Sequence, residues 1–308
     1  MKIERTRNAT RNIIFSGLSQ LINILVPFAM RSIILHFLGV DYLGLNGLFH
    51  SILSILNLAE LGVGSAMVFS MYKPIVEDDK DTICALMRLY RTVYRIIGLF
   101  VLTAGLCLTP FLPHLIKGSV PADINLYILY FMNLGSTVLS YWMFAYKNCL
   151  LAAHQRTDIS SKIVMCVNII SYALKISALA FFRNYYAFLS VQIISQATVN
   201  IIVAAKVNKM YPEYLPGGNL SKDKLQSIAK RVRDLFTSKF SYVISNSADT
   251  IVISKFLGLT VLAIYQNYYF IISSLKSLIE VIIGACTAGV GNSLITESPE
   301  KNYKDLKK

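Results

Sequence analysis

Six charged residues stand inside long apolar stretches of this 308-residue chain. They are Arg31, Glu60, Lys175, Asp249, Lys276 and Glu280. A charge at the centre of a membrane-spanning helix costs roughly 2.5–3.5 kcal/mol on insertion scales, so such residues normally face a bundle interior or a water-filled cavity. They are therefore the first candidates for binding a ligand or a coupling ion.

The two cations Arg31 and Lys175 have the chemistry to bind an anionic headgroup. Lys175 stands about midway along its apolar stretch with no acid nearby in sequence, so its partner must come from another helix or from a ligand. Arg31 lies closer to one end of its stretch, where extending to the membrane surface is the alternative to facing a cavity.

Glu60 has Asn57 one helical turn before it, so the two side chains are expected on one helix face. A carboxyl group beside an amide suits a site for a proton or a monovalent cation. A structural salt bridge from Glu60 to a neighbouring helix is the alternative.

Asp249 lies with Asn246 in the polar run 245–250, in the middle of an apolar stretch. This run is too polar to face lipid, and both residues are candidates for a cavity or a coupling ion. Lys276 and Glu280 are four residues apart on one helix face, and we expect them to pair with each other.

Eight apolar segments position these charges, and each approaches or exceeds the roughly 20 residues that a helix needs to cross a bilayer. They cover residues 12–35, 43–72, 94–113, 124–146, 159–182, 185–205, 235–257 and 260–288. The sequence therefore predicts an all-α, polytopic membrane helix bundle.

The connections between these segments are alternately rich and poor in Lys and Arg along the chain. With the N-terminus in the cytoplasm, 24 of the 30 Lys and Arg residues fall in inside segments and three fall outside, while three lie within spans. The opposite orientation would violate the positive-inside rule at every loop.

The composition excludes several classes of protein. The chain is 55% hydrophobic and 15% charged, with a mean hydropathy of +0.53, which is too apolar for an ordinary soluble domain. The net charge of +13 follows from the basic inside loops, so we expect no nucleic-acid partner. The sequence has no HExxH, no phosphate-binding glycine loop, no Gly-x-Ser-x-Gly elbow and no metal-ligand spacing, so we expect neither an enzyme nor a metal site.

Residues 211–234 form the longest inside connection. Ser221 is a possible N-cap for a basic amphipathic helix, expected either to lie in the membrane interface before span seven or to form a solvated linker. Aromatic residues near span ends, such as Tyr94 and Trp142, are expected in interfacial belts.

The chain contains an internal repeat. With a shift of 219 residues, Ile33–Leu58 aligns without gaps to Val252–Ser277 with 8 identities in 26 positions, including Phe-Leu-Gly at Phe37–Gly39 and Phe256–Gly258. The repeat relates spans one and two to spans seven and eight in the same orientation. Transporters are often built from two such halves.

Two stretches resemble the bacterial polysaccharide-biosynthesis transporters, which flip lipid-linked repeat units of O-antigen, capsule or exopolysaccharide. The first is Phe37–Phe49 (FLGVDYLGLNGLF) with Leu58–Ala66 (LAELGVGSA) and Tyr72–Pro74. The second is Asn246–Gly258 (NSADTIVISKFLG), continuing to Tyr265–Tyr268. The resemblance covers the whole chain in its span pattern, but only these stretches are specific.

The resemblance implies the multidrug/oligosaccharidyl-lipid/polysaccharide exporter architecture. Residues 1–210 would form a six-helix lobe, 211–234 a cytoplasmic linker, and 235–308 the start of a second lobe. The expected function is alternating-access export of undecaprenyl-pyrophosphate-linked oligosaccharide across the bacterial plasma membrane, with no cofactor beyond a coupling Na⁺ or H⁺. Other expected partners are membrane lipids, a polysaccharide polymerase and chain-length proteins.

In this interpretation Arg31 and Lys175 would meet the diphosphate headgroup, and Glu60 and Asp249 would serve the coupling ion. The family implies several further spans, so an inactive truncated fragment is one alternative. A cation-coupled multidrug exporter of the same architecture is another, and it predicts an acidic, aromatic-lined cavity. A membrane-embedded glycosyltransferase or polymerase would need a large outside loop, whereas the outside loops here are short.

Overall fold

The computed structural model describes residues 5–117, 120–121 and 123–296, and within them it contains helices and no strand. The chain divides into two compact units, Met1–Ile264 and Tyr265–Lys308. Helix α10 begins in the first unit and continues in the second. The prediction of an all-helical polytopic bundle is confirmed.

The helices follow the predicted segments, with a break or a change of helix type inside four of the expected spans. Their bounds are α1 Arg5–Phe37, α2 Val40–Leu56, η1 Asn57–Glu60, α3 Val63–Glu77, α4 Lys80–Leu108, η2 Thr109–Leu115, α5 Leu126–Trp142, η3 Ala145–Lys147, α6 Asn148–Ala153, α7 Thr157–Ser177, η4 Ala178–Phe182, α8 Tyr185–Met210, α9 Lys222–Leu257 and α10 Leu259–Thr296. The element η4 is a single turn of π-helix that continues α7.

Five helical segments of the described chain are long and apolar enough to cross a membrane. They are Gly17–Phe37, Val40–Glu77, Lys80–Leu115, Thr157–Phe182 and Tyr185–Met210. The pair Leu126–Trp142 and Ala145–Ala153, bent by 44°, makes a sixth if it counts as one span. Helices α9 and α10 coincide with the seventh and eighth expected spans but are not among these segments.

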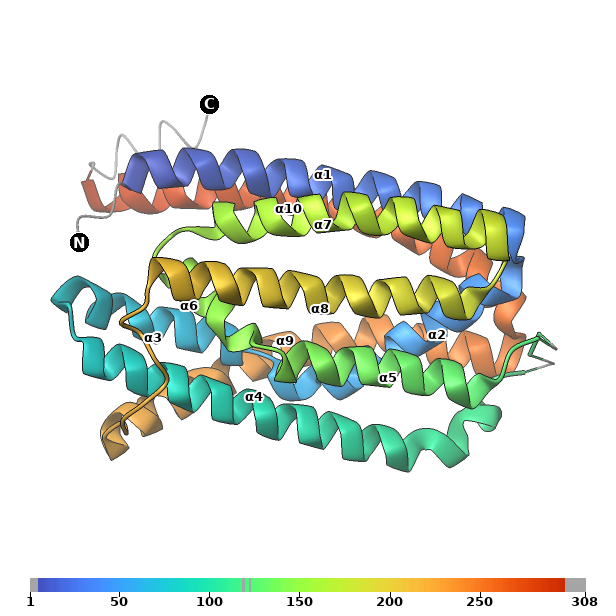
Figure 1. The fold of residues 1–308 in the computed structure, drawn as a ribbon, viewed down its shortest axis with the longest axis horizontal. Helices are drawn as coiled ribbons and strands as arrows, with labels where there is room; N and C mark the ends of the chain where they lie inside the picture. The colour runs from blue at the N-terminus through green and yellow to red at the C-terminus, as the bar shows by residue number, and fades with distance from the viewer. Residues whose placement is uncertain (1–4, 118–119, 122, 297–308) are drawn as a thin grey trace. The chain divides into compact units, whose positions relative to one another are not determined.

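Five helices of the first unit lie side by side in the order α1, α7, α8, α5, α4, with α2, α3 and α9 behind them (Figure 1). The connections α3–α4, α6–α7 and α8–α9 lie at one end, which we call the basic end because these connections are rich in basic residues (Figure 1). The connections α1–α2, η4–α8 and α9–α10 lie at the other end.

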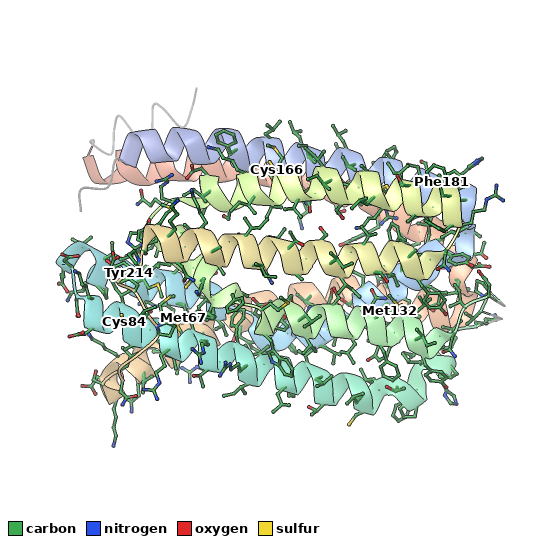
Figure 2. The ribbon with its side chains drawn as sticks, in the orientation of Figure 1. Met67, Cys84, Met132, Cys166, Phe181 and Tyr214 are labelled. Atoms are coloured by element: carbon green, nitrogen blue, oxygen red, sulfur yellow. The ribbon has the colours of Figure 1, made fainter. Side chains whose placement is uncertain are left out.

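Apolar side chains occur both between the helices and on their outer faces, as expected of a bundle in lipid. Phe49, Met67 and Tyr130 are buried between helices, whereas Phe181 on the outside of the bundle is 81% exposed (Figure 2). The exposed faces of α4, α7 and α8 carry many further large apolar residues, which agrees with the membrane character of the chain.

A 3₁₀ turn breaks the second span between α2 and α3. Residues 57–60 form the turn η1, and Gly62 then adopts a left-handed conformation with φ of +86° before α3 begins at Val63. A Cβ atom at Gly62 would lie 2.6 Å from the Cβ of Leu235, so this glycine also permits close approach of α9. The sequence predicted a continuous span over 43–72, because its apolar composition gives no sign of the break.

The two repeats form the same turn. Gly39 has φ of 111° and ψ of 175°, and Gly258 has φ of 93° and ψ of 177°, each between two long helices. The turns also meet, because the hydroxyl of Thr260 donates to Asp41 Oδ1 at 2.9 Å and these residues are separated by the repeat shift of 219. A Cβ atom at Gly44 would lie 2.4 Å from the carbonyl oxygen of Leu259, so α2 and the turn are in close contact.

Helix α9 differs from the expected linker. Ser221 caps it as predicted, with Oγ accepting from the amide of Lys224 at 3.4 Å, but the helix then continues without a break to Leu257. Its basic residues contact neighbouring helices: Lys224 Nζ donates to Thr82 Oγ1 at 2.9 Å, and the Arg231 guanidinium lies 3.7 Å from the centre of the Phe69 ring. The amphipathic segment is therefore continuous with the seventh expected span, and its expected place in the membrane interface stays a prediction.

Candidate functional site

The carboxylate of Glu60 lies at the η1 break, where it accepts hydrogen bonds from two tyrosines of other helices. The hydroxyl of Tyr141 from α5 donates to Oε2 at 2.9 Å, and the hydroxyl of Tyr94 from α4 donates to Oε1. Both tyrosines are buried. Because hydrogen bonds to a charged acceptor are the stronger kind, this arrangement can stabilise Glu60 as an anion between helices.

A third tyrosine extends the network. Tyr90, one turn before Tyr94 on α4, donates its hydroxyl to that of Tyr94 at 2.8 Å. The ring centres of these two residues are 4.4 Å apart, and those of Tyr94 and Tyr141 are 5.5 Å apart. Gly64 makes room for the pair, since a Cβ atom there would lie 3.1 Å from the Tyr90 hydroxyl.

Glu60 and the tyrosines line a cavity of about 720 Å³ in the first unit. The lining comes from η1, α3, α4, α5, α6, α7 and α8. Its polar and aromatic members are Glu60, Ser65, Phe69, Tyr72, Tyr90, Tyr94, Ser140, Tyr141, Phe144, Asn148, Cys149, Ser160, Gln196 and Asn200. Among the residues that the structure places around this cavity, Glu60 alone is charged.

Amide groups occupy other parts of the wall. Gln196 and Asn200 are one turn apart on α8, and the buried Nδ2 of Asn200 has no hydrogen-bond partner in the described part of the chain. Asn57 Oδ1 is likewise buried without a hydrogen-bond partner in the described part of the chain. It lines a smaller cavity of about 390 Å³, which Glu60 also lines. Buried polar atoms without partners are costly, so these two amides are available to a ligand, an ion or water.

The chemistry of the cavity is that of a proton or cation site next to a neutral polar binding surface. A single carboxylate can exchange a proton or hold a monovalent cation, and the hydroxyl and amide groups can bond a polar cargo. In the part of the chain that the structure describes, no group of three or more His, Cys, Asp or Glu residues is placed to hold a metal ion.

Lys175 is buried elsewhere, between α7 and α8. Its Nζ donates to Gln192 Oε1 at 3.4 Å and lies 5.4 Å from the Tyr172 ring centre and 5.1 Å from that of Phe188. No carboxylate of the described residues pairs with it, and its hydrogen-bond partner Gln192 comes from another helix. Lys175 does not line the Glu60 cavity, so the two expected parts of the site are separate in this structure.

Arg31 on α1 is half-buried and lies close enough to His50 for their charges to interact, but it does not line the cavity either. Asp249 is exposed on α9, while Ser247 and Thr250 of the same polar run are buried. The side chain of Asn246 is outside the described residues.

Lys276 is exposed on α10. The side chain of Glu280 is outside the described residues, so the expected Lys276–Glu280 pair stays a prediction.

Tyr90, Tyr94 and Tyr141 are the site residues that sequence reasoning missed. Tyr94 was predicted to lie in an interfacial belt, whereas it is buried and holds Glu60. The one available signal was the i, i+4 spacing of Tyr90 and Tyr94, which places two hydroxyls on one face of α4.

The fold and the cavity define a multi-pass helical membrane protein with a carboxylate-containing cavity between its spans. No protein-family model matches the chain, and no curated protein or solved structure matches it. The relation to polysaccharide transporters therefore stays a prediction from two sequence stretches.

Proposed function

We propose that this chain is a bacterial plasma-membrane flippase for undecaprenyl-pyrophosphate-linked oligosaccharides. Glu60 is the site at which a coupling H⁺ or Na⁺ binds. The observation that carries this proposal is the cavity of about 720 Å³ between the spans with one tyrosine-held carboxylate in its wall.

The lining supports a sugar cargo. Tyrosine rings offer flat apolar faces with a hydroxyl at the edge, and Asn148, Gln196 and Asn200 offer paired amide donors and acceptors. The volume lies within the range of ordinary ligand sites. The two sequence stretches that resemble polysaccharide transporters point to the same cargo.

The diphosphate of such a cargo needs cationic partners outside this cavity. Arg31 and Lys175 remain the proposed partners, and they would reach the headgroup in another arrangement of the helices, as alternating access provides. A buried cation without an acidic partner, such as Lys175, is compensated when an anion binds beside it.

A cation-coupled exporter of hydrophobic cations is the second candidate, and one observation favours it. The cavity is acidic and rich in aromatic residues, and none of its described lining residues is a cation. Such a wall attracts a positively charged cargo through the carboxylate and through cation–π contacts.

Both candidates can be tested in vesicles that contain the purified chain. One vesicle set carries a fluorescent polyprenyl-diphosphate oligosaccharide, whose exposure on the outer surface is read with a membrane-impermeant quencher. A second set is offered ethidium as the hydrophobic cation. Each set is run with and without a proton or sodium gradient, using wild type, Glu60→Gln and Glu77→Gln.

Glu77 is the matched control because it is an exposed carboxylate at the end of α3, 3.7 Å from Lys73. Gradient-dependent flipping by wild type and Glu77→Gln, but not by Glu60→Gln, is the expected result. Ethidium transport without flipping would select the second candidate. Gradient-dependent transport that survives Glu60→Gln would remove Glu60 from the coupling role.

A further inference from the structure

A second large cavity lies at the basic end of α7 and α8, and the transport proposal does not use it. Its volume is about 750 Å³. Its walls combine four cations, one carboxylate and several apolar side chains. They are Arg156, Asp158, Ile159, Lys162, Ile163, Ile202, Ala205, Lys206, Lys209 and Met210.

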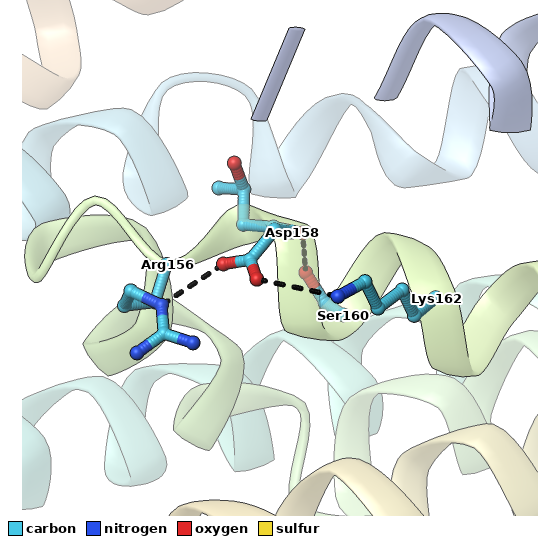
Figure 3. A network of polar contacts seen from close by, with 5 residues as sticks. Arg156, Asp158, Ser160 and Lys162 are labelled. Carbon is cyan, nitrogen blue, oxygen red and sulfur yellow. Dashed lines mark hydrogen bonds and ion pairs between the residues drawn. The ribbon is translucent and has the colours of Figure 1, made fainter. Parts of the chain in front are cut away.

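One buried carboxylate organises two of the cations (Figure 3). Asp158 is fully buried in the first turn of α7, with Oδ1 3.0 Å from Arg156 Nε and Oδ2 3.9 Å from Lys162 Nζ. The Lys162 ammonium also lies 3.9 Å from the centre of the Phe15 ring of α1. These contacts hold two positive groups in place at the cavity wall.

The other two cations come from α8 and leave the cavity positively charged. Lys206 and Lys209 are three residues apart and exposed, and no carboxylate of the described residues pairs with either. With one acid against four bases, the cavity has the charge to bind an anion. Clustered cations that a buried acid holds in place suit a phosphate group.

An apolar stripe runs away from the cavity along the same face of α7. Ile159 and Ile163 line the cavity, and the helical spacing continues through Cys166, Ile170 and Leu174. Cys166 is exposed (Figure 2), as are Ile170 at 62% and Leu174 at 53%. A free anion would use only the cations, whereas a lipid would use the cations and the stripe together.

We propose that this cavity binds the phosphate headgroup of an anionic membrane lipid, with an acyl chain lying along the α7 stripe. The lipid belongs to the leaflet at the basic end, which the positive-inside rule makes the cytoplasmic leaflet. Basic pockets between membrane helices on that side have the chemistry to hold such headgroups. The proposal does not depend on which cargo the Glu60 cavity carries.

The test measures lipid binding to the full detergent-purified chain by native mass spectrometry, with dioleoylphosphatidylglycerol and dioleoylphosphatidylcholine as probes. The informative variant is Lys206→Gln/Lys209→Gln. Lys222→Gln/Lys230→Gln is its control, because it removes the same charge from exposed residues of α9. Far-UV circular dichroism shows that each variant keeps its helices.

Wild type is expected to prefer phosphatidylglycerol, and the Lys206/Lys209 variant to bind it roughly 30-fold more weakly. For the two lysines together this factor corresponds to about 2 kcal/mol, at about 1.4 kcal/mol per factor of ten. The control variant should bind like wild type. Equal binding of the two lipids, or undiminished binding by the Lys206/Lys209 variant, would overturn the proposal.

A further arm distinguishes the lipid from free phosphate. Inorganic phosphate is added to the wild-type complex with phosphatidylglycerol. Retention of the lipid supports a site that binds the headgroup and the acyl chain together. Complete displacement of the lipid by inorganic phosphate would show an anion site without lipid selectivity and would refute the assignment.

Discussion

Replacing Tyr141 by Phe tests whether Glu60 is a charged carboxylate held between helices. The Tyr141 hydroxyl donates to Glu60 Oε2 at 2.9 Å, and the residue is 4% exposed, so the change removes one hydrogen bond and little else. A hydrogen bond to a charged group contributes about 1.5–3 kcal/mol. We therefore expect Tyr141→Phe to lower the free energy of unfolding by about 2 kcal/mol if Glu60 is ionised.

Tyr130→Phe provides the matched control within the same helix. Its hydroxyl donates to the carbonyl oxygen of Gly105 at 2.9 Å, so the bond also crosses from α5 to α4 but ends on a neutral acceptor. Neutral hydrogen bonds between membrane helices average about 0.6 kcal/mol. In a Glu60→Gln background the cost of Tyr141→Phe should fall to about this value, whereas the cost of Tyr130→Phe should not change.

The assay is reversible unfolding of the purified protein in mixed micelles with increasing sodium dodecyl sulfate. The single tryptophan, Trp142, reports on the same region because its indole ring packs against Gly98 of α4. The double-mutant cycle should give a coupling energy of about 1–2 kcal/mol between Tyr141 and Glu60. Equal costs for Tyr141→Phe and Tyr130→Phe in both backgrounds would refute the idea of a tyrosine-held anion.

Three further predictions use the same unfolding assay. Gly62→Ala should lower the free energy of unfolding by about 1–3 kcal/mol because of the left-handed backbone at this position, and the contact with Leu235 should add to the loss. Its control is Gly135→Ala, whose Cβ would meet nothing within 4 Å and which should be neutral or stabilising. Equal effects of the two substitutions would contradict the reasoning. Lys175→Met should raise the free energy of unfolding by about 2 kcal/mol, because it removes a buried cation without an acidic partner; a clear loss of stability would mean that neighbouring groups compensate the charge. Burial lowers the pKa of His154 below its ordinary value of 6.5, because it disfavours the charged imidazolium. The stability that the neutral His154 contributes is therefore complete above pH 6.5 and is lost as the pH falls below 6.5 toward the folded-state pKa. His154→Phe should remove this acid sensitivity of the free energy of unfolding, and an unchanged pH profile would refute the assignment to this residue.

The positions of the helices follow largely from local sequence. Apolar length predicted where the helices lie, of which five or six qualify as spans, and the repeated Phe-Leu-Gly predicted two equivalent turns, which Gly39 and Gly258 form with nearly the same backbone angles. Ser221 marked the start of α9 because an N-cap depends on residues three apart. These features depend on short-range rules, so one sequence contains enough information to predict them.

The candidate site depends on contacts that local rules do not reach. Tyr94 and Tyr141 stand 34 and 81 residues from Glu60, and only the packing of α4 and α5 brings their hydroxyls to the carboxylate. Apolar spans resemble one another in composition, so hydropathy does not indicate which helices pack against each other. For the same reason Gln192, which accepts from Lys175, was not predicted as its partner.

The second span makes different contacts at its Gly39 turn and at the η1 break. At the Gly39 turn, Asp41 accepts from Thr260, its own equivalent in the second repeat. The close packing of Gly44 against Leu259 also stabilises the span at this turn.

In the middle of the same span, η1 replaces regular helix over residues 57–60 and presents Glu60 to the cavity. A short 3₁₀ segment within a helix often marks a hinge. Any bend of this span would therefore occur at η1, next to the carboxylate, and not at the Gly39 turn. In the proposed transport cycle, protonation or cation binding at Glu60 would act directly on this bend.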